Sequence, residues 1–198
     1  MYTKGLRVMS KVELRLLPFI YPIPTVLLGA NVNGKPNYNV VGNCGIIKVS
    51  NPAVIYVSSN VTHYTNTGIR ECGSFSVNFP SSDMAEITDY CGIVSGKKVD
   101  KSNVFRSFYG KLKNVPMIEE CPINLECKVI QTVIIHDMEV YMGEVVGAYA
   151  NEQCLTNGSP DMKKVDPLVY SLQNSYWKMG DEIAPAFSIG KGFKPDEK

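Results

Sequence analysis

The distribution of apolar and polar residues along the chain indicates mainly β structure. Short runs rich in Val, Ile, Tyr and Phe are bounded by Gly, Pro and Asn, as β-strands commonly are. The runs predicted as strands are residues 25–32, 53–59, 75–79, 123–135 and 138–146. Within 123–129 apolar and polar residues alternate, which predicts one buried face and one hydrated face that carries Asn124, Glu126 and Lys128. The alternation breaks at Ile130, where we expect a β-bulge or a sharp bend.

Turn signals connect these strands. Asn33-Gly34 supplies the positive φ angles that a tight hairpin turn requires, and His136 is expected at a second hairpin turn. Residues 24–57 are therefore predicted to form sequential antiparallel strands. A chain of many strands and few helices indicates a closed or half-closed barrel, which removes exposed sheet edges.

Helical signals are fewer. From Asp83, which can cap the first amides with Glu86 completing a capping box, apolar residues recur at helical spacing as far as Gly92. A second short helix is predicted over residues 100–108. A third is predicted to follow the polar turn near residue 62 and to run toward Cys72.

Composition and charge narrow the class of protein. The chain has 198 residues, of which 44% are hydrophobic and 20% charged, as in ordinary globular domains. We predict a single domain over residues 1–198. Its formal net charge of +1 provides no basic surface for nucleic acid or for a membrane. Small molecules and other proteins are the expected partners.

The cysteines and the uncharged N-terminal stretch bear on the cellular compartment of the protein and on whether it spans a membrane. No signal-peptide pattern precedes the cysteines and no CxxC motif occurs, so we expect reduced thiols, a cytoplasmic protein and no metal site. Residues 16–34 carry no charge, but Pro18, Pro22 and Pro24 would break a membrane-spanning helix. This stretch is predicted to be an extended approach to a strand.

The stretch VSSNVTHYTNTGIRE, residues 57–71, changes from apolar to polar where a strand should end and a helix begin. The first amides of a helix have no partner inside it, and the helix dipole is positive there, so an anion is favoured. Side-chain donors follow in the same stretch, which together could hold a phosphate: Ser58, Thr62, His63, Thr65 and Arg70. The alternative is a simple helix start, with Thr62 as the N-cap residue and Arg70 as a solvated charge.

Two further polar segments allow close approach of a ligand. TDYCGIVSGKKVDKS, residues 88–102, combines glycines with lysines, although a helix end followed by an exposed loop also explains it. NYNVVGNCGII, residues 37–47, places Asn and Gly in a strand, where either a flat ligand or a β-bulge fits. A phosphorylated, planar, largely apolar cofactor would use all three segments.

The chain lacks the usual hydrolytic motifs. It contains two histidines, His63 and His136, and neither GxSxG nor HExxH occurs. We assign no catalytic side chain.

The three segments, together with CPINLECKV and YMGEVVGAY, resemble the flavin reductase-like FMN-binding split barrels, specifically the flavoredoxin branch. The resemblance extends over about residues 16–191, which we take as the core, and residues 192–198 are expected to be a frayed tail. It implies a mainly β fold, an antiparallel, Greek-key-like split barrel with a few flanking α-helices. It also implies a homodimer that binds FMN non-covalently near the subunit interface.

The resemblance assigns site residues by position. Residues 39–45 would lie along the isoalloxazine ring, Ser58 and residues 62–65 would take the ribityl phosphate, and residues of 91–101 would approach from a third segment. The residues carried over are Asn39, Val40, Asn43, Cys44, Gly45, Ser58, Thr62, His63, Tyr64, Thr65, Cys91, Ser95 and Lys101. Relatives often have threonine where this chain has Val40-Val41, which puts the tuning of the flavin in doubt.

The resemblance leaves the reaction partly open. The first reading is an FMN-dependent oxidoreductase in which NAD(P)H or a protein electron donor reduces FMN and a small-molecule or protein acceptor is reduced in turn. The second is an FMN electron carrier of the flavoredoxin type, working between protein partners without a nicotinamide site. A third, suggested only by the two valines, is a barrel that binds another small ligand and has lost redox function.

Overall fold

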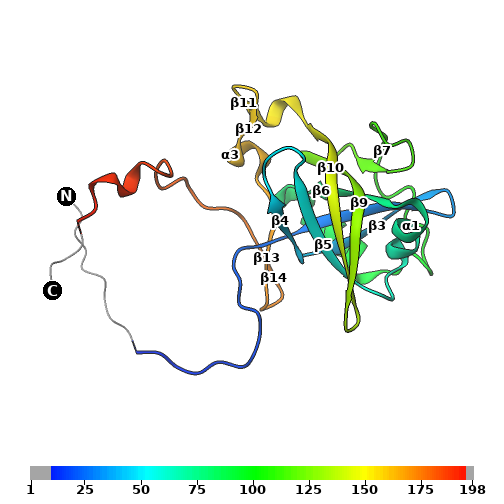
Figure 1. The fold of residues 1–198 in the computed structure, drawn as a ribbon, viewed down its shortest axis with the longest axis horizontal. Coiled ribbons are helices and arrows are strands. Elements are labelled where there is room, and N and C mark those ends of the chain that lie inside the picture. Colours follow the sequence, from blue (N-terminus) through cyan, green and yellow to red (C-terminus); the bar gives the residue numbers. More distant parts are fainter. Residues whose placement is uncertain (1–9, 195–198) are drawn as a thin grey trace.

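A computed structural model describes residues 10–194 of the chain. Its largest element is a seven-stranded antiparallel sheet in which β3 contacts β5 although four strands separate them in the sheet order, so that the sheet curls into a nearly closed barrel (Figure 1). In spatial order its strands are β3 (Lys35–Val41), β2 (Val26–Val32), β6 (Ser74–Phe79), β9 (Ile123–Ile135), β10 (Met138–Ala150), β5 (Val54–Asn60) and β4 (Cys44–Lys48).

Smaller elements surround this sheet. The short strands are β1 (Ile23–Pro24), β13 (Val169–Ser171) and β14 (Ser175–Trp177) in one sheet, β7 (Ser107–Phe108) with β8 (Met117–Ile118), and β11 (Leu155–Thr156) with β12 (Ser159–Pro160). The α-helices are α1 (Tyr64–Cys72), α2 (Ala85–Ile93) and α3 (Met162–Val165), and the 3-10 turns are η1 (Ser82–Met84), η2 (Glu152–Cys154) and η3 (Ile189–Gly192). No helix in the part of the chain that the structure describes is long and apolar enough to cross a membrane.

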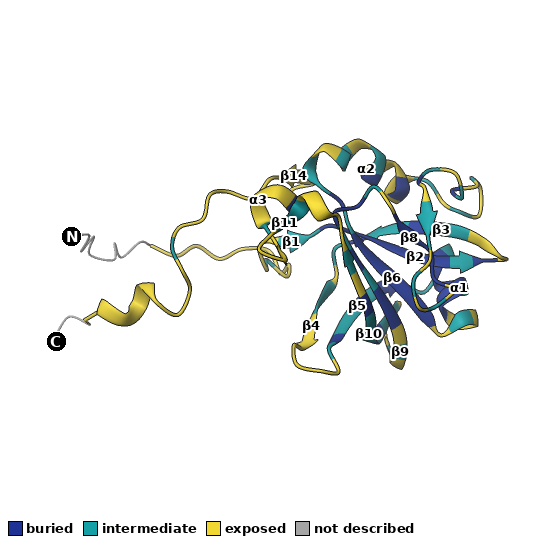
Figure 2. Ribbon diagram, turned by 90° about the horizontal axis from the view of Figure 1, so that it is seen from above, coloured by how far each residue is buried: buried dark blue, intermediate teal, exposed yellow. Residues whose placement is uncertain are grey.

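Two apolar clusters hold the body together. The first fills the barrel and contains Val26, Leu28, Val57, Phe75 and Tyr141 among others. The second lies on the other face of β2 and β3, where α2 and the segment before β9 cover them, and it includes Leu27, Tyr38, Cys91, Phe105, Ile118 and Cys121. β2 is therefore buried on both faces, as its nearly continuous apolar sequence requires (Figure 2).

Several local predictions are confirmed. Asn33 and Gly34 form the turn between β2 and β3 with φ of 52° and 76°, and His136 forms the turn between β9 and β10 with φ of 54°. Ile130 is the extra residue of a β-bulge, because Gln131 pairs with Met142 and Val129 pairs with Gly143. Residues 10–22 are extended and lack helix and strand.

The predicted hydrated face of β9 is confirmed at Lys128, which is exposed, and is wrong at Asn124 and Glu126. Asn124 is 3% exposed and Glu126 is fully buried, because this face packs on the segment that contains β7 and β8. The Glu126 carboxylate accepts hydrogen bonds from the backbone amides of Lys111 and Leu112, and the Asn124 amide donates to the carbonyl of Ile118. Polar side chains thus satisfy the backbone of an irregular segment that covers the sheet.

Three other predictions fail for tertiary reasons. The prediction of sequential antiparallel strands over residues 24–57 holds for the pairs β2–β3 and β4–β5 but fails between β3 and β4, because β4 lies at the far end of the sheet. Residues 100–108 form turns and β7, since Asp100 pairs with Lys35 and Lys101 turns into the body. Asp83 lies in η1 and does not cap α2, whose N-cap residue is Met84 without a side-chain bond, so the capping box does not form.

Candidate functional site

The junction of β5 and α1 is a tight polar turn. The backbone amide and the hydroxyl of Thr62 both donate to Asn60 Oδ1, at 3.1 and 2.7 Å. His63 is the N-cap residue of α1, and no side chain among residues 10–194 caps the helix. Its first turn also carries no acidic residue. The helix therefore presents free amides and the positive end of its dipole at this turn.

The ring of His63 is fixed from one side. Its Nδ1 lies 3.0 Å from Asn39 Nδ2 and 2.9 Å from Ser59 Oγ. An amide nitrogen can only donate, so Nδ1 accepts and the hydrogen of the neutral ring is on Nε2. Burial, with a smaller effect from the charge of Lys101, lowers the pKa of His63, which favours this neutral form.

Thr65 is held in a similar way. It is 1% exposed, and its hydroxyl accepts a hydrogen bond of 2.7 Å from Asn37 Nδ2 on β3. The hydroxyl hydrogen remains available for a ligand. Two residues of the first turn region are thus oriented by amides from β3.

Lys101 brings a buried cation to the same place. It is 3% exposed, and its ammonium donates to the carbonyls of Tyr38 at 3.0 Å and Cys91 at 2.7 Å. Within residues 10–194 no carboxylate lies within 4 Å of its Nζ, and burial lowers the pKa of the ammonium. A buried cation without an anion is costly, so an anionic ligand would compensate it.

These groups line one cavity of about 300 Å³, which we call the anion hollow. Its lining contains Asn37, Asn39, Thr62, His63, Tyr64, Thr65, Gly92, Ile93, Val94, Ser95, Gly96 and Lys101, with no acidic residue. A Cβ atom on Gly96 would collide with the side chains of Asn37 and Tyr64, so the close approach of this loop requires glycine. A neighbouring hollow of about 330 Å³ adds the exposed Lys97 and Lys98.

A buried network anchors α1 behind the hollow. Glu139 of β10 is 5% exposed and accepts hydrogen bonds from Arg70, Asn66 and Tyr141. Burial alone would raise the pKa of Glu139, but these hydrogen bonds outweigh it and the pKa lies below its ordinary value. Arg70 is therefore committed to Glu139 and not to the hollow. Gly68 packs directly against the backbone of Asn31, which lets α1 lie close to β2.

The structure divides the predicted site residues into groups. Asn39, Thr62, His63, Tyr64, Thr65, Ser95 and Lys101 line the anion hollow. Val40 and Asn43 line a separate pocket with Tyr170 and Tyr176. Cys44 and Gly45 pair with Val57 and Tyr56 of β5, and Ser58 of β5 donates its backbone amide to the carbonyl of Asn43.

The two predicted cysteines are protonated thiols. Cys91 is fully buried in the second apolar cluster, and its carbonyl accepts from Lys101 of the hollow. Cys44 packs against the barrel core. Burial raises the pKa of each to about 11. Neither is activated as a nucleophile.

Sequence reasoning missed Asn37 and Ser59, which orient Thr65 and His63. Asn37 lies in the polar segment 37–47 that was singled out, and Ser59 adjoins Ser58. The alternation of side chains along β3 offered a signal, since Asn37 and Asn39 must share a face.

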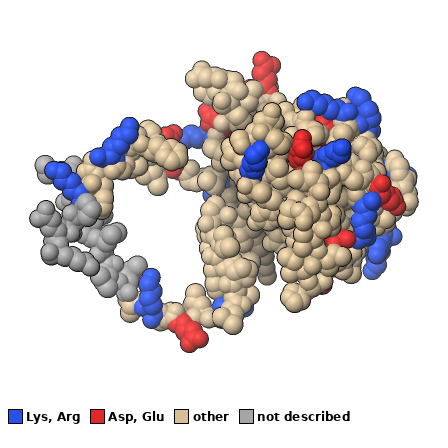
Figure 3. All heavy atoms as spheres, viewed as in Figure 1, with Lys and Arg blue, Asp and Glu red and all other residues tan. Residues whose placement is uncertain are grey.

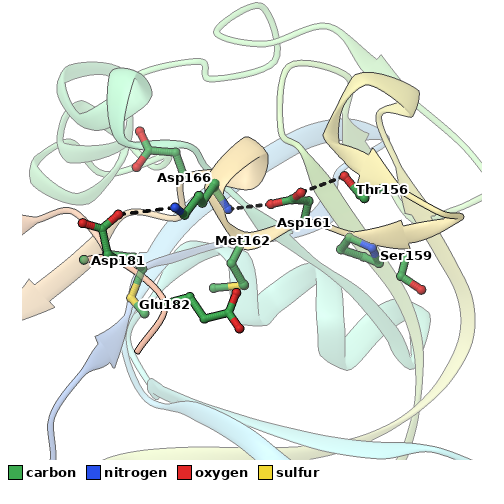
Figure 4. Close-up of a pocket in the computed structure, with 11 residues that line it drawn as sticks. Thr156, Ser159, Asp161, Met162, Asp166, Asp181 and Glu182 are labelled. Carbon is green, nitrogen blue, oxygen red and sulfur yellow. Dashed lines mark hydrogen bonds and ion pairs between the residues drawn. The ribbon is translucent and has the colours of Figure 1, made fainter. Parts of the chain in front are cut away.

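A larger cavity lies elsewhere and has different chemistry. It measures about 900 Å³ between the β11–β12 hairpin, α3 and the C-terminal segment, and Figure 4 shows it. Asp161, Asp166, Asp181 and Glu182 line it with Lys163 as its one cation. We call it the acidic cavity, and its carboxylates would repel an anion.

The fold is an antiparallel split barrel, and the hollow at the junction of β5 and α1 is lined by hydrogen-bond donors and one buried cation. Residues 20–176 match the flavin reductase like domain, and the chain belongs to this family, on its flavoredoxin branch.

Solved structures agree with this placement. The flavoredoxin from Methanosarcina acetivorans is 49% identical, with 92% of this chain and 98% of that chain covered and a TM-score of 0.89. The flavoredoxin of Desulfovibrio vulgaris (Miyazaki F) is 33% identical over 92% of this chain and 100% of that chain, with a TM-score of 0.85. The FMN-binding protein from Thermus thermophilus, 20% identical over 91% and 99% with a TM-score of 0.75, shares the split-barrel fold.

Proposed function

We propose that this chain binds FMN without a covalent bond and works as an FMN-dependent oxidoreductase. NAD(P)H or a reduced protein supplies the electrons, and a small molecule or a second protein accepts them. The observation that carries this proposal is the buried Lys101 ammonium, which has no carboxylate partner among the described residues and lies beside the uncapped start of α1. FMN carries a phosphate, and its chemistry is the acceptance and release of a hydride or of electrons.

The residues of the anion hollow fit a phosphate. Neutral donors are available from His63 Nε2, the Thr65 hydroxyl and the first amides of α1, and Lys101 supplies the charge. The glycine at position 96 lets the loop after α2 lie directly against Asn37 and Tyr64, which also line the hollow. These groups are hydrogen-bonded to β3 or to backbone before a ligand arrives, so little orientation is needed on binding.

The protein's other contribution is position and shielding. The edge formed by Asn43, Cys44 and Gly45 continues from the same end of β3 that holds Asn39. Backbone amides there would stabilise negative charge on a reduced ring. Val40 provides apolar surface without a hydroxyl group, whereas Val41 points the other way into the barrel core.

The second candidate is an electron carrier between proteins without a nicotinamide site. Its support is the similarity to two flavoredoxins at 49% and 33% identity. Both candidates use the same FMN site, and they differ only in the electron donor.

An anaerobic titration separates the two candidates. The FMN-loaded protein is titrated with NADH and, separately, with NADPH while the flavin absorbance is followed. Rapid bleaching by either nicotinamide supports the reductase. Bleaching by dithionite but by neither nicotinamide supports the carrier, and a purified protein that retains no FMN at micromolar concentrations contradicts both.

We also propose that the protein is a homodimer in the cytoplasm. β4 ends the main sheet, and its outer edge has no partner strand within residues 10–194. Ile46 and Val49 there are 71% and 82% exposed, and the surface over β4, β5 and the end of the β9–β10 hairpin carries few charges (Figure 3). An apolar sheet edge of this kind favours contact with a second copy. The six cysteines are free, in keeping with a reducing compartment.

Light scattering after size exclusion tests the dimer. The double variant Ile46→Lys and Val49→Lys is expected to be monomeric, whereas Ile183→Lys, in the C-terminal segment, leaves the dimer intact. A wild-type monomer at tens of micromolar, or a double variant that stays dimeric, contradicts the proposal.

A further inference from the structure

A segment before β1 has the sequence pattern of a strand but forms none. Charged and apolar residues alternate strictly over six positions, which is the period of an amphipathic β-strand. In chain order these residues are Lys11, Val12, Glu13, Leu14, Arg15 and Leu16. The structure places them outside any helix or strand. We call residues 11–16 the alternating segment.

The alternating segment leaves its apolar side chains and its backbone uncovered. Val12, Leu14 and Leu16 are 79%, 61% and 99% exposed. No amide of residues 11–16 donates to a backbone carbonyl among the described residues. Large apolar side chains gain free energy when a surface removes them from water. The segment is therefore suited to a partner that offers both an apolar surface and free backbone groups.

The outer edge of β4 offers both of these. β4 ends the main sheet and pairs only with β5 among the described residues, so its other edge presents unpaired backbone groups. Ile46, Ile47 and Val49 are 71%, 50% and 82% exposed on or beside this strand. The pairing of β4 with β5 is regular from Cys44 to Ile46, which is the part of the edge that a further strand would extend.

The C-terminal segment does not have the same pattern. Residues 181–193 are also largely exposed, but their apolar and polar residues do not alternate. Pro185, Gly190 and Gly192 interrupt them, and proline and glycine disfavour a paired strand. The C-terminal segment therefore provides a matched control for the alternating segment.

The alternating segment lies away from its own barrel. Figures 1 and 2 both show the chain before β1 running outward from the body. Residues 17–22 connect the segment to β1 and can span about 20 Å when extended, which is enough to reach a neighbouring molecule. In a symmetric pair each copy supplies one segment and one edge, so the same contact forms twice.

We propose that the alternating segment of one copy adds as a strand to the outer edge of β4 in a second copy, and that this exchange is reciprocal. The proposal rests on the homodimer proposed above, and it names the part of the second copy that covers Ile46 and Val49. The apolar side chains of the segment lie on the second copy, and its charged side chains stay in water. Main-chain hydrogen bonds supply the affinity, and the alternation of side chains fixes the register.

The first measurement is the dissociation constant of the dimer, determined by analytical ultracentrifugation of the full-length protein. Adjacent amides of a strand point to opposite sides, so Glu13→Pro and Leu14→Pro are both measured. At least one of them removes a donor to β4 and should raise the constant about tenfold or more. Ile183→Pro is the control, because it places proline in the exposed C-terminal segment and should leave the constant unchanged. Circular dichroism should be unchanged in all three variants, since these positions lie outside the barrel.

The second measurement identifies what the segment contacts. A photo-crosslinking benzophenone amino acid is placed at position 14, unlabelled and nitrogen-15-labelled proteins are mixed, and mass spectrometry identifies the crosslinked peptides. We expect crosslinks to residues 44–49 that join a labelled chain to an unlabelled chain. Crosslinks to β4 of the same chain only, or crosslinks that miss β4, overturn the proposal.

The outcomes distinguish the strand exchange from the homodimer itself. A dimeric wild type whose dissociation constant neither proline variant changes overturns the strand exchange and leaves the homodimer unaffected. A wild type that is monomeric at tens of micromolar contradicts the homodimer and the exchange together.

Discussion

The anion hollow is smaller than the acidic cavity, yet its lining is the better suited of the two to an anionic ligand. The acidic cavity is about three times larger, at about 900 against 300 Å³. Its one cation, Lys163, is already paired with Asp181 at 3.4 Å. The hollow has no acidic residue, and its cation, Lys101, is buried without an anion among the described residues.

The difference lies in the donors of each cavity and not in its volume. In the acidic cavity the polar groups satisfy each other, as where Thr156 donates to Asp161 at 2.7 Å. In the hollow, amides of β3 bind the side chains of Thr65 and His63, and both residues line the same cavity. Such preorganised donors are typical of a site that binds an anion.

The strongest test of this comparison removes two donors from the hollow. The double variant His63→Ala and Thr65→Ala should lose about 2 to 4 kcal/mol of FMN binding, or about 30- to 1000-fold in affinity, because two hydrogen bonds to the phosphate disappear. Quenching of flavin fluorescence measures the affinity, and circular dichroism checks the fold.

Its control lies in the acidic cavity. Thr156→Ala with Ser159→Ala removes two hydroxyls there and should leave FMN affinity within about twofold of the wild type, because the altered groups do not meet the phosphate. Equal losses in both double variants would show that the effect is a general one on stability.

The next largest effect is expected at Lys101. Lys101→Met should weaken FMN binding by about 10- to 100-fold, as for a hydrogen bond to a charged group, whereas Lys163→Met in the acidic cavity should not weaken it. Calorimetric titration measures both. Unchanged FMN affinity in Lys101→Met would contradict the role of the Lys101 ammonium in binding the phosphate.

The lowered pKa of Lys101 predicts the direction in which FMN affinity and protein stability change with pH. Its pKa in the free protein lies below the ordinary 10.5, and a bound phosphate raises it again, so affinity should fall as pH rises through the lowered pKa. The stability of the FMN-free protein should change in the opposite direction, because the unfolded chain holds the proton longer and the folded state gains stability as pH rises through that window. Lys101→Met should lack both trends.

A smaller effect on binding is expected from the network behind α1. Glu139→Gln leaves Arg70 and Tyr141 without their carboxylate and should lower the free energy of unfolding by about 1 to 3 kcal/mol, with only a few-fold loss of FMN affinity. The pKa of Glu139 is lowered in the folded state, so the difference from the wild type should be complete above its ordinary pKa and shrink as pH falls below it. Urea unfolding at several pH values measures this, with the exposed Glu182→Gln as a control that should show no loss.

The smallest effect is expected from the exposed lysines at the rim. Lys97→Ala with Lys98→Ala should reduce FMN affinity by less than about fivefold, and added salt should remove the difference, because exposed charges are screened. A salt-independent loss as large as that of Lys101→Met would mean that the rim and not the buried cation binds the phosphate.

Local sequence signals predicted much of the fold but not its arrangement. The strands and the bulge at Ile130 follow from alternation and β-branched residues, which act over a few positions. The pairing of β5 with β10, which puts β4 at the end of the sheet, and the burial of Glu126 depend on segments separated in the chain. The predicted helix over residues 100–108 does not form, because the Lys101 side chain is buried and its ammonium donates to the carbonyl of the distant Tyr38.

The candidate site likewise has a part that local sequence predicts and a part that depends on residues distant in the chain. The polar residues of the turn before α1 are adjacent in sequence, so their meeting could be predicted. The roles of Asn37 and Ser59 could not, because each depends on which strand lies beside the turn. The buried state of Lys101 had no sequence signal, since a lysine in a Gly- and Lys-containing loop is ordinarily exposed.

The most direct test compares FMN with riboflavin, which lacks only the phosphate, in the wild-type protein and in the His63→Ala, Thr65→Ala variant. We expect the wild type to bind FMN at least about 100-fold more tightly than riboflavin, because the phosphate meets Lys101 and the start of α1. The variant should lose most of this ratio while its riboflavin affinity changes little. Equal affinity of the wild type for the two flavins would contradict the account.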